Sequence, residues 1–254
     1  MGCGPGGRLD RAEHLETGQI VELDSPPDSA GLSEGQIFAQ GDEHGLWTLP
    51  DPLPRHASSL MDQGEIAPPA LQDPGVASLH EGRVAVFLIR DSHALTREAD
   101  PLPWFPPALA WPTVYWVDGR DQASDGLDIW GWNHRAGPPF PVVTAPGDQR
   151  HVASSETWLA WIDDDGIWLQ DHQSHARRLH RADAGFRAGP SLWGSVACWE
   201  ERTAGDIDVR CSDGLEATGA GDQGWPSRWG PWLLIRQGDL PWLVTADAAG
   251  EVAP

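Results

Sequence analysis

The sequence predicts an all-β fold, a six-bladed β-propeller built of four-stranded antiparallel blades. Short polar phrases recur along the chain: TAPGDQ at residues 144–149 returns as TGAGDQ at 218–223. Gly (29 residues) and Pro (23 residues) supply frequent turns, as a protein of many short strands requires. No segment keeps an apolar i, i+3, i+4, i+7 pattern beyond two turns, so we expect no helix of ordinary length.

The apolar runs recur at a regular interval. They end at Gln40, Phe87, Trp116, Trp161, Trp199 and Ile235. Their mean spacing is about 39 residues, which is typical of propeller blades. Six such ends therefore predict six blades. We also expect Gln149 and Gln223, which close the two recurring phrases, to occupy equivalent positions in their blades.

Residues 190–218 show the strands expected of one blade. Residues 191–193 form a short first strand, 196–200 an apolar second strand and 207–211 an alternating third strand. The fourth strand of the preceding blade is expected at 176–180, just before the connection to this unit. Four antiparallel strands in each unit correspond to one blade.

The ends of the chain and the first two blades depart from this pattern. Residues 20–23 have the position of a fourth strand before the first blade, and we expect them to complete the last blade and close the ring. Residues 251–254 compete for the same place. The second blade is short by about one hairpin, which predicts three strands, and 48–75 is a long Pro-rich insertion. Residues 1–19 are expected to be a flexible tether before a single propeller domain over residues 20–254.

Two hairpin sequences carry a family resemblance. VYWVDGRDQASDGLDIWGWN (114–133) and ACWEERTAGDIDVRC (197–211) are similar to the Trp-x-Asp-x-Arg…Asp-Ile-Trp type repeats of the TolB-like six-bladed β-propeller family. The resemblance spans about residues 20–247 and is weakest over 41–76. These motifs specify the repeat type and not one activity, because the family includes periplasmic interaction modules, surface proteins and propellers attached to peptidases.

Charge and motifs exclude several classes of function. The chain has 38 acidic and 17 basic residues, a net charge of −21. Such a surface repels phosphate groups, so we expect binding neither to nucleic acid nor to an anionic membrane surface. The sequence has no P-loop, dinucleotide fingerprint, Ser/His/Asp set or Cys/His zinc spacing. We therefore expect no cofactor and no bound metal.

The three Cys residues bear on the compartment. Gly2 and Cys3, followed by a Gly/Pro-rich stretch, resemble the end of a bacterial lipoprotein signal. Cys3 is thus a candidate lipidation site and the expected route of any membrane contact; an incidental Cys in a disordered terminus is the alternative. Cys198 and Cys211 lie on neighbouring expected strands and would form a disulfide if they face each other, but a one-residue register change would separate them. Both features favour an extracytoplasmic location in a bacterium, in the periplasm or at the cell surface.

An acid follows three of the apolar strands. Asp118, Asp163 and Glu201 each come two residues after the Trp that ends the run. A ring of such acids could bind a cation or a basic peptide. Acids in turns also accept local backbone hydrogen bonds and pair with nearby Arg, and this second interpretation needs no ligand. We favour the second interpretation.

The Trp residues fall into two groups. Trp116, Trp161 and Trp199 occupy one repeated position on the second strand, which predicts packing between blades. Trp111, Trp193 and Trp229 lie near the expected inner strands and are candidates to bind a peptide or a sugar at the channel. Burial in the core is the alternative for these three.

These observations favour a monomeric, exported propeller that binds a protein or peptide partner and is not an enzyme. The alternative is a polysaccharide-active or carbohydrate-binding propeller with acids and Trp facing the channel. A spacer between an anchor and another element is a third hypothesis.

Overall fold

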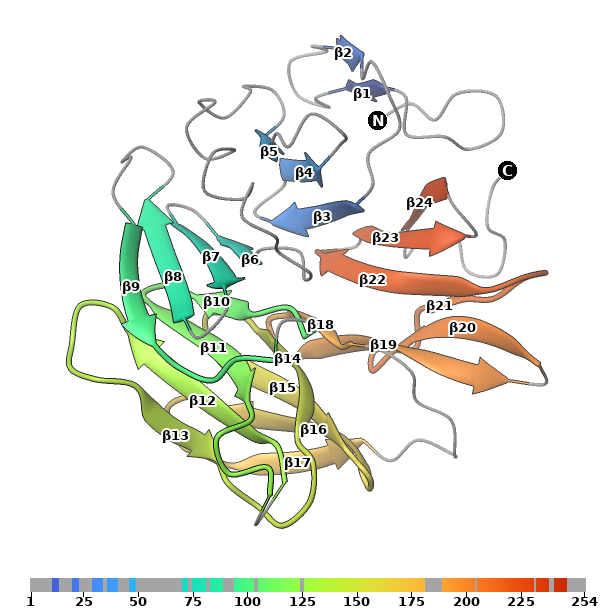
Figure 1. Ribbon diagram of the computed structural model, residues 1–254. Coiled ribbons are helices and arrows are strands. Elements are labelled where there is room, and N and C mark those ends of the chain that lie inside the picture. Colours follow the sequence, from blue (N-terminus) through green and yellow to red (C-terminus); the bar gives the residue numbers. More distant parts are fainter. Residues whose placement is uncertain are drawn as a thin grey trace.

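The computed structural model shows a protein built of β-strands (Figure 1). It describes residues 11–13, 20–22, 29–33, 36–40, 46–48, 70–72, 75–80, 83–88, 94–102, 105–123, 126–180, 189–203, 205–230, 232–237 and 240–245. These residues form strands, turns and irregular segments, and none of them is helical. The expected all-β class is confirmed.

Six sheets follow one another along the described chain, and we number them 1 to 6. Sheets 2 to 5 have four antiparallel strands each. Sheet 2 contains β6 (Ala70–Gln72), β7 (Gly75–His80), β8 (Arg83–Leu88) and β9 (Ala94–Glu98). Sheet 3 contains β10 (Ala108–Ala110), β11 (Thr113–Asp118), β12 (Asp128–Asn133) and β13 (Phe140–Val143). Sheet 4 contains β14 (Arg150–Ser154), β15 (Trp158–Asp163), β16 (Gly166–Asp171) and β17 (Arg177–His180). Sheet 5 contains β18 (Ser191–Trp193), β19 (Val196–Thr203), β20 (Asp206–Cys211) and β21 (Glu216–Ala217).

Sheets 1 and 6 have three described strands each. Sheet 1 contains β3 (Ser29–Ser33), β4 (Gln36–Gln40) and β5 (Leu46–Thr48). Sheet 6 contains β22 (Gln223–Trp229), β23 (Trp232–Gln237) and β24 (Leu240–Thr245). A separate two-stranded sheet joins β1 (Arg11–Glu13) to β2 (Ile20–Glu22).

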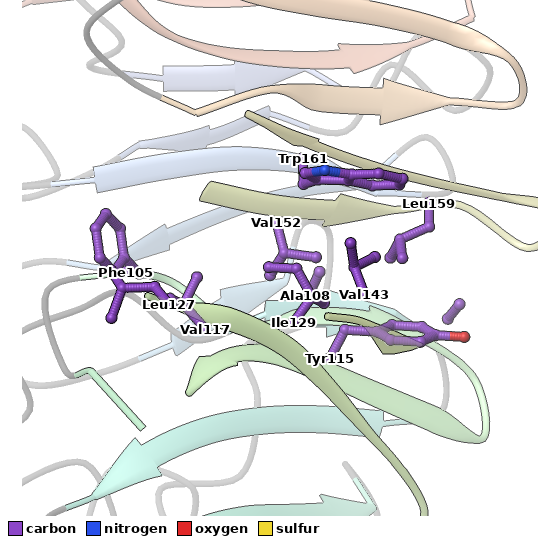
Figure 2. Close-up of a cluster of buried hydrophobic side chains, with 11 residues drawn as sticks. Phe105, Ala108, Tyr115, Val117, Leu127, Ile129, Val143, Val152, Leu159 and Trp161 are labelled. Atoms are coloured by element: carbon purple, nitrogen blue, oxygen red, sulfur yellow. The ribbon is translucent and has the colours of Figure 1, made fainter. Parts of the chain in front are cut away.

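The core lies between neighbouring sheets. Strand β11 reads as a continuous apolar run because both of its faces are buried: Val114 and Trp116 pack toward sheet 2, and Tyr115 and Val117 toward sheet 4. Figure 2 shows the cluster of buried side chains between sheets 3 and 4, in which side chains of sheet 3 meet Val152, Leu159 and Trp161 of sheet 4. Further clusters join sheets 4 and 5 and sheets 5 and 6. Sheets 3, 4 and 5 therefore each serve as a layer between two neighbouring sheets.

The first strands of the sheets lie toward the middle of the molecule (Figure 1). Strands β6, β10, β14, β18 and β22 contact one another in that order, and β22 contacts β3 of sheet 1. Strand β23 contacts β3 as well. The last sheet thus packs beside the first, although they are far apart in the sequence.

The recurring phrase forms the connection from one sheet to the next. Gly147 and Gly221 have positive φ angles of 93° and 89°, a conformation that glycine adopts at little cost. Gln149 and Gln223 are each 1% exposed. The Nε2 of Gln149 donates to the carbonyl of Gly147 (2.9 Å), and the Nε2 of Gln223 donates to that of Gly221 (2.6 Å). The two Gln residues occupy equivalent positions, as the repeat predicts.

The neighbouring Asp residues tie this connection to the sheet that it leaves. Asp148 Oδ1 accepts the backbone N–H of Leu127 (3.1 Å), and Asp222 Oδ1 accepts that of Ile207 (3.0 Å). Leu127 and Ile207 both lie at the start of a third strand, across from the connection. The Gly-Asp-Gln sequence therefore clamps the end of one sheet while the chain enters the next.

The expected closure by residues 20–23 is wrong. Ile20–Glu22 pairs with Arg11–Glu13, not with sheet 6. A strand that is only a few residues away closes a much shorter loop than one more than about 200 residues away, and the entropic cost of pairing is lower. β1 itself lies within residues 1–19, which were expected to be a tether.

The expectation of a short second blade is also wrong. Sheet 2 has four strands, and Ala70–Gln72, inside the expected insertion at 48–75, supplies the first. Phe87 consequently lies on the third strand and not on the second. Both β3–β4 and β7–β8 are antiparallel pairs whose strands are separated in the sequence by the dipeptide Glu-Gly. Such hairpins look alike in sequence, whichever two strands of a sheet they join.

Candidate functional site

Asp118 is buried at the end of β11, where it organises the turn that follows. Its Oδ2 accepts a hydrogen bond from Trp116 Nε1 (2.8 Å), and its Oδ1 pairs with Arg120 Nε (2.6 Å). The Arg120 guanidinium in turn lies 3.5 Å from the ring centroid of Trp130. Burial alone would raise the pKa of Asp118, but the hydrogen bonds from Arg120 and Trp116 outweigh it and hold the pKa below its ordinary value. Asp118 is therefore an ionised structural acid.

Asp163 and Glu201 also make local contacts. Asp163 Oδ1 accepts the backbone N–H groups of Asp165 (2.8 Å) and Gly166 (3.2 Å), which closes the turn between β15 and β16. Glu201 forms an ion pair with Arg210 across the β19–β20 hairpin. With Asp118, these acids belong to three different sheets. Within the described residues no group of three or more His, Cys, Asp or Glu side chains could hold a metal ion.

The three candidate Trp residues lie at the end of a first strand or in the turn after it. Trp111 is half-buried. The centroids of its ring and of the His134 ring are 4.4 Å apart, and the Arg135 guanidinium lies 5.3 Å from the centroid of the Trp111 ring. Trp193 ends β18 and is 43% exposed. Trp229 ends β22, opposite Trp232, and its side chain lies outside the described residues. The second-strand Trp residues are buried as predicted, at 0%, 2% and 9% exposure for Trp116, Trp161 and Trp199.

Trp225 is the most exposed large apolar side chain of the described chain, at 56%, and sequence reasoning missed it. It has a positive φ of 54° at a register shift in β22. That conformation is rare for a bulky residue. Its backbone N–H donates to Glu200 Oε1 (2.7 Å), which fixes the strand there. The repeat does mark this position in the sequence: Trp225 follows Gln223 by two residues, as His151 follows Gln149.

His151 has the same backbone conformation but a different environment. Its φ is 52°, and it too lies at a register shift, in β14. The ring is half-buried and meets Phe105 edge-on, with 4.7 Å between the centroids. Burial, and then the charge of Arg150, lower the pKa of His151 to about 4. The imidazole is therefore neutral at physiological pH.

Cys198 and Cys211 face each other on β19 and β20 and form a disulfide. Their Cα atoms are 3.9 Å apart. The N–H of Cys211 donates to Leu215 and not across the hairpin, so the two residues form a non-hydrogen-bonded pair, in which side chains approach closely. Both are buried between sheets 5 and 6. Cys3 lies outside the described residues.

A Tyr–His–Ser group between sheets 3 and 4 resembles a catalytic set only in composition. The rings of Tyr115 and His172 stack at 5.5 Å. His172 Nε2 lies 3.2 Å from the backbone carbonyl of Ser155, while the Ser155 hydroxyl donates to the carbonyl of Gly194 (2.9 Å). Burial raises the pKa of Tyr115 to about 12. His172 Nδ1 lies 3.5 Å from the Tyr115 hydroxyl, but the raised pKa of Tyr115 keeps that hydroxyl protonated. His172 Nε2 meets the carbonyl of Ser155 and not its hydroxyl, so this geometry contains no activated nucleophile.

Comparison with solved structures supports a propeller architecture. XC5397 from Xanthomonas campestris, described as a gluconolactonase, matches with a TM-score of 0.58 over 96% of this chain and 98% of its own, at 14% identity. A chain of a nidogen–laminin complex matches with a TM-score of 0.55 over 82% of this chain and 84% of its own, at 13% identity. The fold is that of a β-propeller. A prolyl endopeptidase matches at a TM-score of 0.50 and 11% identity, over 82% of this chain but 39% of that one.

At these identities the likeness shows the fold alone. No family model and no curated protein matches the sequence. Within the described residues, no helix is both long enough and apolar enough to span a membrane.

Proposed function

We propose that this propeller is an extracytoplasmic binding module that engages a protein or peptide partner and catalyses no reaction. One contrast carries the proposal. The acids that could do chemistry, such as Asp118 and Asp163, are held in turns and ion pairs, whereas Trp193 and Trp225 stay exposed. Trp is one of the three residue types enriched among the side chains that dominate the binding energy of protein interfaces.

The architecture supports this role. We infer that sheets 1 to 6 are six blades of the TolB-like type, with β22 against β3 completing the ring. Buried layers between the sheets make a rigid support, and the described turns at the ends of the sheets carry exposed side chains. The Cys198–Cys211 disulfide supports export to an oxidising compartment. We further propose that the protein is a monomer there, held at a membrane only through lipid on Cys3.

The alternative is a carbohydrate-active propeller, since exposed Trp rings also stack on sugars. A glycosidase needs one carboxylic acid whose pKa is raised so that it can donate a proton. Asp118 and Asp171 instead have lowered pKa values: Asp118 through Arg120 and Trp116 against the effect of burial, and Asp171 through hydrogen bonds from Ser174. Both stay ionised at neutral pH and cannot act as that acid.

Affinity capture from a cell-envelope fraction tests the proposal. The immobilised protein should retain one defined protein that Trp193→Ala or Trp225→Ala no longer retains, while Leu179→Ala, which shortens an exposed side chain on β17, still does. A parallel screen offers lactones and polysaccharides as substrates. Turnover of one of these, with no captured partner, would falsify the binding role.

A further inference from the structure

We propose that one end of the propeller, around Trp225, binds an arginine-bearing segment of the partner protein, with the Trp225 ring as the platform for a guanidinium. This inference rests on the binding function proposed above and names the face and the chemistry of the partner. We call this end the crossing face. Its described residues are the connections between sheets and the turns between second and third strands: 99–102, 105–107, 119–123, 126–127, 144–149, 164–165, 189–190, 205 and 218–222.

The Trp225 ring is presented by a built support. The support begins with Glu200, which is only 5% exposed and accepts the Trp225 N–H. In sheets 3 and 4 the position of Glu200, directly after the second-strand Trp, is held by the apolar residues Val117 and Ile162. A buried carboxylate at an apolar position of the repeat thus holds a Trp in a left-handed conformation. Trp225 is left 56% exposed, whereas the equivalent His151 is covered in part by Phe105.

The chain itself shows what its Trp rings bind. Arg guanidinium groups lie 3.5 to 5.3 Å from the centroids of five Trp rings, namely Trp111, Trp130, Trp132, Trp158 and Trp161. Stacking of Arg on Trp is the strongest common cation–π pairing in proteins. Within the described residues no Arg lies over Trp225 or Trp193, the two most exposed Trp side chains. A partner can therefore supply the cation that these rings lack.

Charge distinguishes the face of Trp225 from the face of Trp193. The described residues of the crossing face include six Asp (Asp100, Asp121, Asp148, Asp164, Asp165 and Asp222) and one Arg. The opposite end comprises the turns at 111–112, 134–139, 155–157, 172–176, 194–195, 212–215 and 230, with two acids and one Arg. A segment carrying positive charge is therefore attracted to the crossing face, and an anionic one is repelled.

A guanidinium is planar and carries five N–H donors, which suits a face that combines an exposed aromatic ring with carboxylates.

The test measures binding of three fluorescein-labelled octapeptides by anisotropy: alternating Arg and Gly, alternating Lys and Gly, and alternating Gln and Gly. The Arg peptide should bind tightest, since its planar group stacks best, and raising the salt concentration should weaken it. Trp225→Gly removes the ring while keeping the left-handed backbone, so it should fold normally. We expect this variant to bind the Arg peptide about fivefold more weakly than the unchanged protein does. Leu179→Ala, which shortens an exposed apolar side chain on β17, is the control and should change the affinity by less than about twofold.

The possible results separate this inference from the proposed function. Equal binding of the Gln and Arg peptides, or an unchanged affinity for Trp225→Gly, overturns the inference. If Trp193→Ala lowers the affinity for the Arg peptide and also fails to retain the captured envelope protein, the binding function stands, but the partner binds at the end opposite the crossing face. If Trp225→Gly loses both the peptide and the captured protein, both proposals are supported.

Discussion

At the level of single residues, the polar side chains of this protein act mainly on their own turns and strands. Asp118 receives hydrogen bonds from the Trp two residues before it and the Arg two residues after it. Asp163 closes the turn in which it lies. Acids that recur at this position of the repeat therefore stabilise the turn of their own repeat, and this role needs no ligand.

Replacement of Asp118 should reveal an ionised, stabilising carboxylate. Asp118→Asn keeps an oxygen for Trp116 but loses the charge beside Arg120, and we expect a loss of about 1–2 kcal/mol in unfolding free energy at pH 7. The pKa of Asp118 is lower in the folded protein than in the unfolded chain, so its contribution is present above the ordinary Asp pKa and is lost as pH falls below it. Urea unfolding between about pH 3 and pH 7 measures this. The difference in unfolding free energy between the protein and Asp118→Asn should disappear toward low pH. Asp164→Asn, which removes one partner of an exposed ion pair with Arg150, is the control and should cost less than about 0.5 kcal/mol.

His151 should make stability fall on mild acidification. Its pKa of about 4 lies below the ordinary value of 6.5 because burial and Arg150 disfavour the charged ring. A lowered His pKa means that the unfolded chain binds the proton first, so the folded state loses stability as pH drops from about 6.5 to 4. Thermal melts of the protein and of His151→Gln across this range should show a smaller pH dependence in the variant. An unchanged slope would show that His151 titrates normally.

At the level of elements, the connections between sheets hold more of the structure than their polar composition suggests. The Gly-Asp-Gln phrase was recognisable in the sequence as a repeated turn. Its role as a clamp on the preceding sheet depends on backbone groups of Leu127 and Ile207. These lie 21 residues before Asp148 and 15 residues before Asp222, and they come close only in the folded protein.

The two Gln residues of this phrase should differ in their contribution to stability. Gln149 makes three hydrogen bonds, to the backbone of Ala145 and Gly147, whereas Gln223 makes one, to Gly221. We expect Gln149→Ala to cost about 2 kcal/mol and Gln223→Ala about 1 kcal/mol in denaturant unfolding. Gln173→Ala, at an exposed turn, is the control and should cost less than about 0.5 kcal/mol. Equal losses for Gln149 and Gln223 would contradict the hydrogen-bond assignment.

The β19–β20 hairpin should depend on its disulfide. Removing Cys198 and Cys211 together by Ala substitution releases a loop of 12 intervening residues, and we expect a loss of about 3 kcal/mol. Reduction by dithiothreitol should lower the free energy of unfolding of the protein by a similar amount and leave that of the double variant unchanged. Two additional free thiols in the unreduced, unfolded protein would contradict the bond.

At the level of the whole molecule, the buried layers between sheets oppose a large excess of negative charge. The net charge of −21 disfavours the compact state through self-repulsion. Adding NaCl from about 0.01 M to 0.5 M at pH 7 should therefore raise the melting temperature by several degrees. The same additions near pH 4.6, the isoelectric point of the sequence, should have little effect. A melting temperature insensitive to salt at pH 7 would show that the charges are already compensated.

Much of this architecture could be predicted from the sequence because the determining signals are local. Turn residues, alternation within short strands and the interval of about 39 residues between apolar ends specify an all-β repeat. The burial of Trp116, Trp161 and Trp199 followed from their repeated position on a strand with two buried faces. Each of these features is a property of a few neighbouring residues.

The tertiary structure alone decided which strands meet and which side chains remain at the surface. The partner of Ile20–Glu22 and the place of Phe87 within sheet 2 depend on which of several short strands pair. The exposure of Trp225 depends on its support by Glu200, 25 residues away in the neighbouring sheet. A hairpin sequence is the same whichever strands of a sheet it joins, and a Trp is equally apolar in a core and on a face. Only the packing of one sheet against the next, through contacts such as that of Glu200 with Trp225, distinguishes these outcomes.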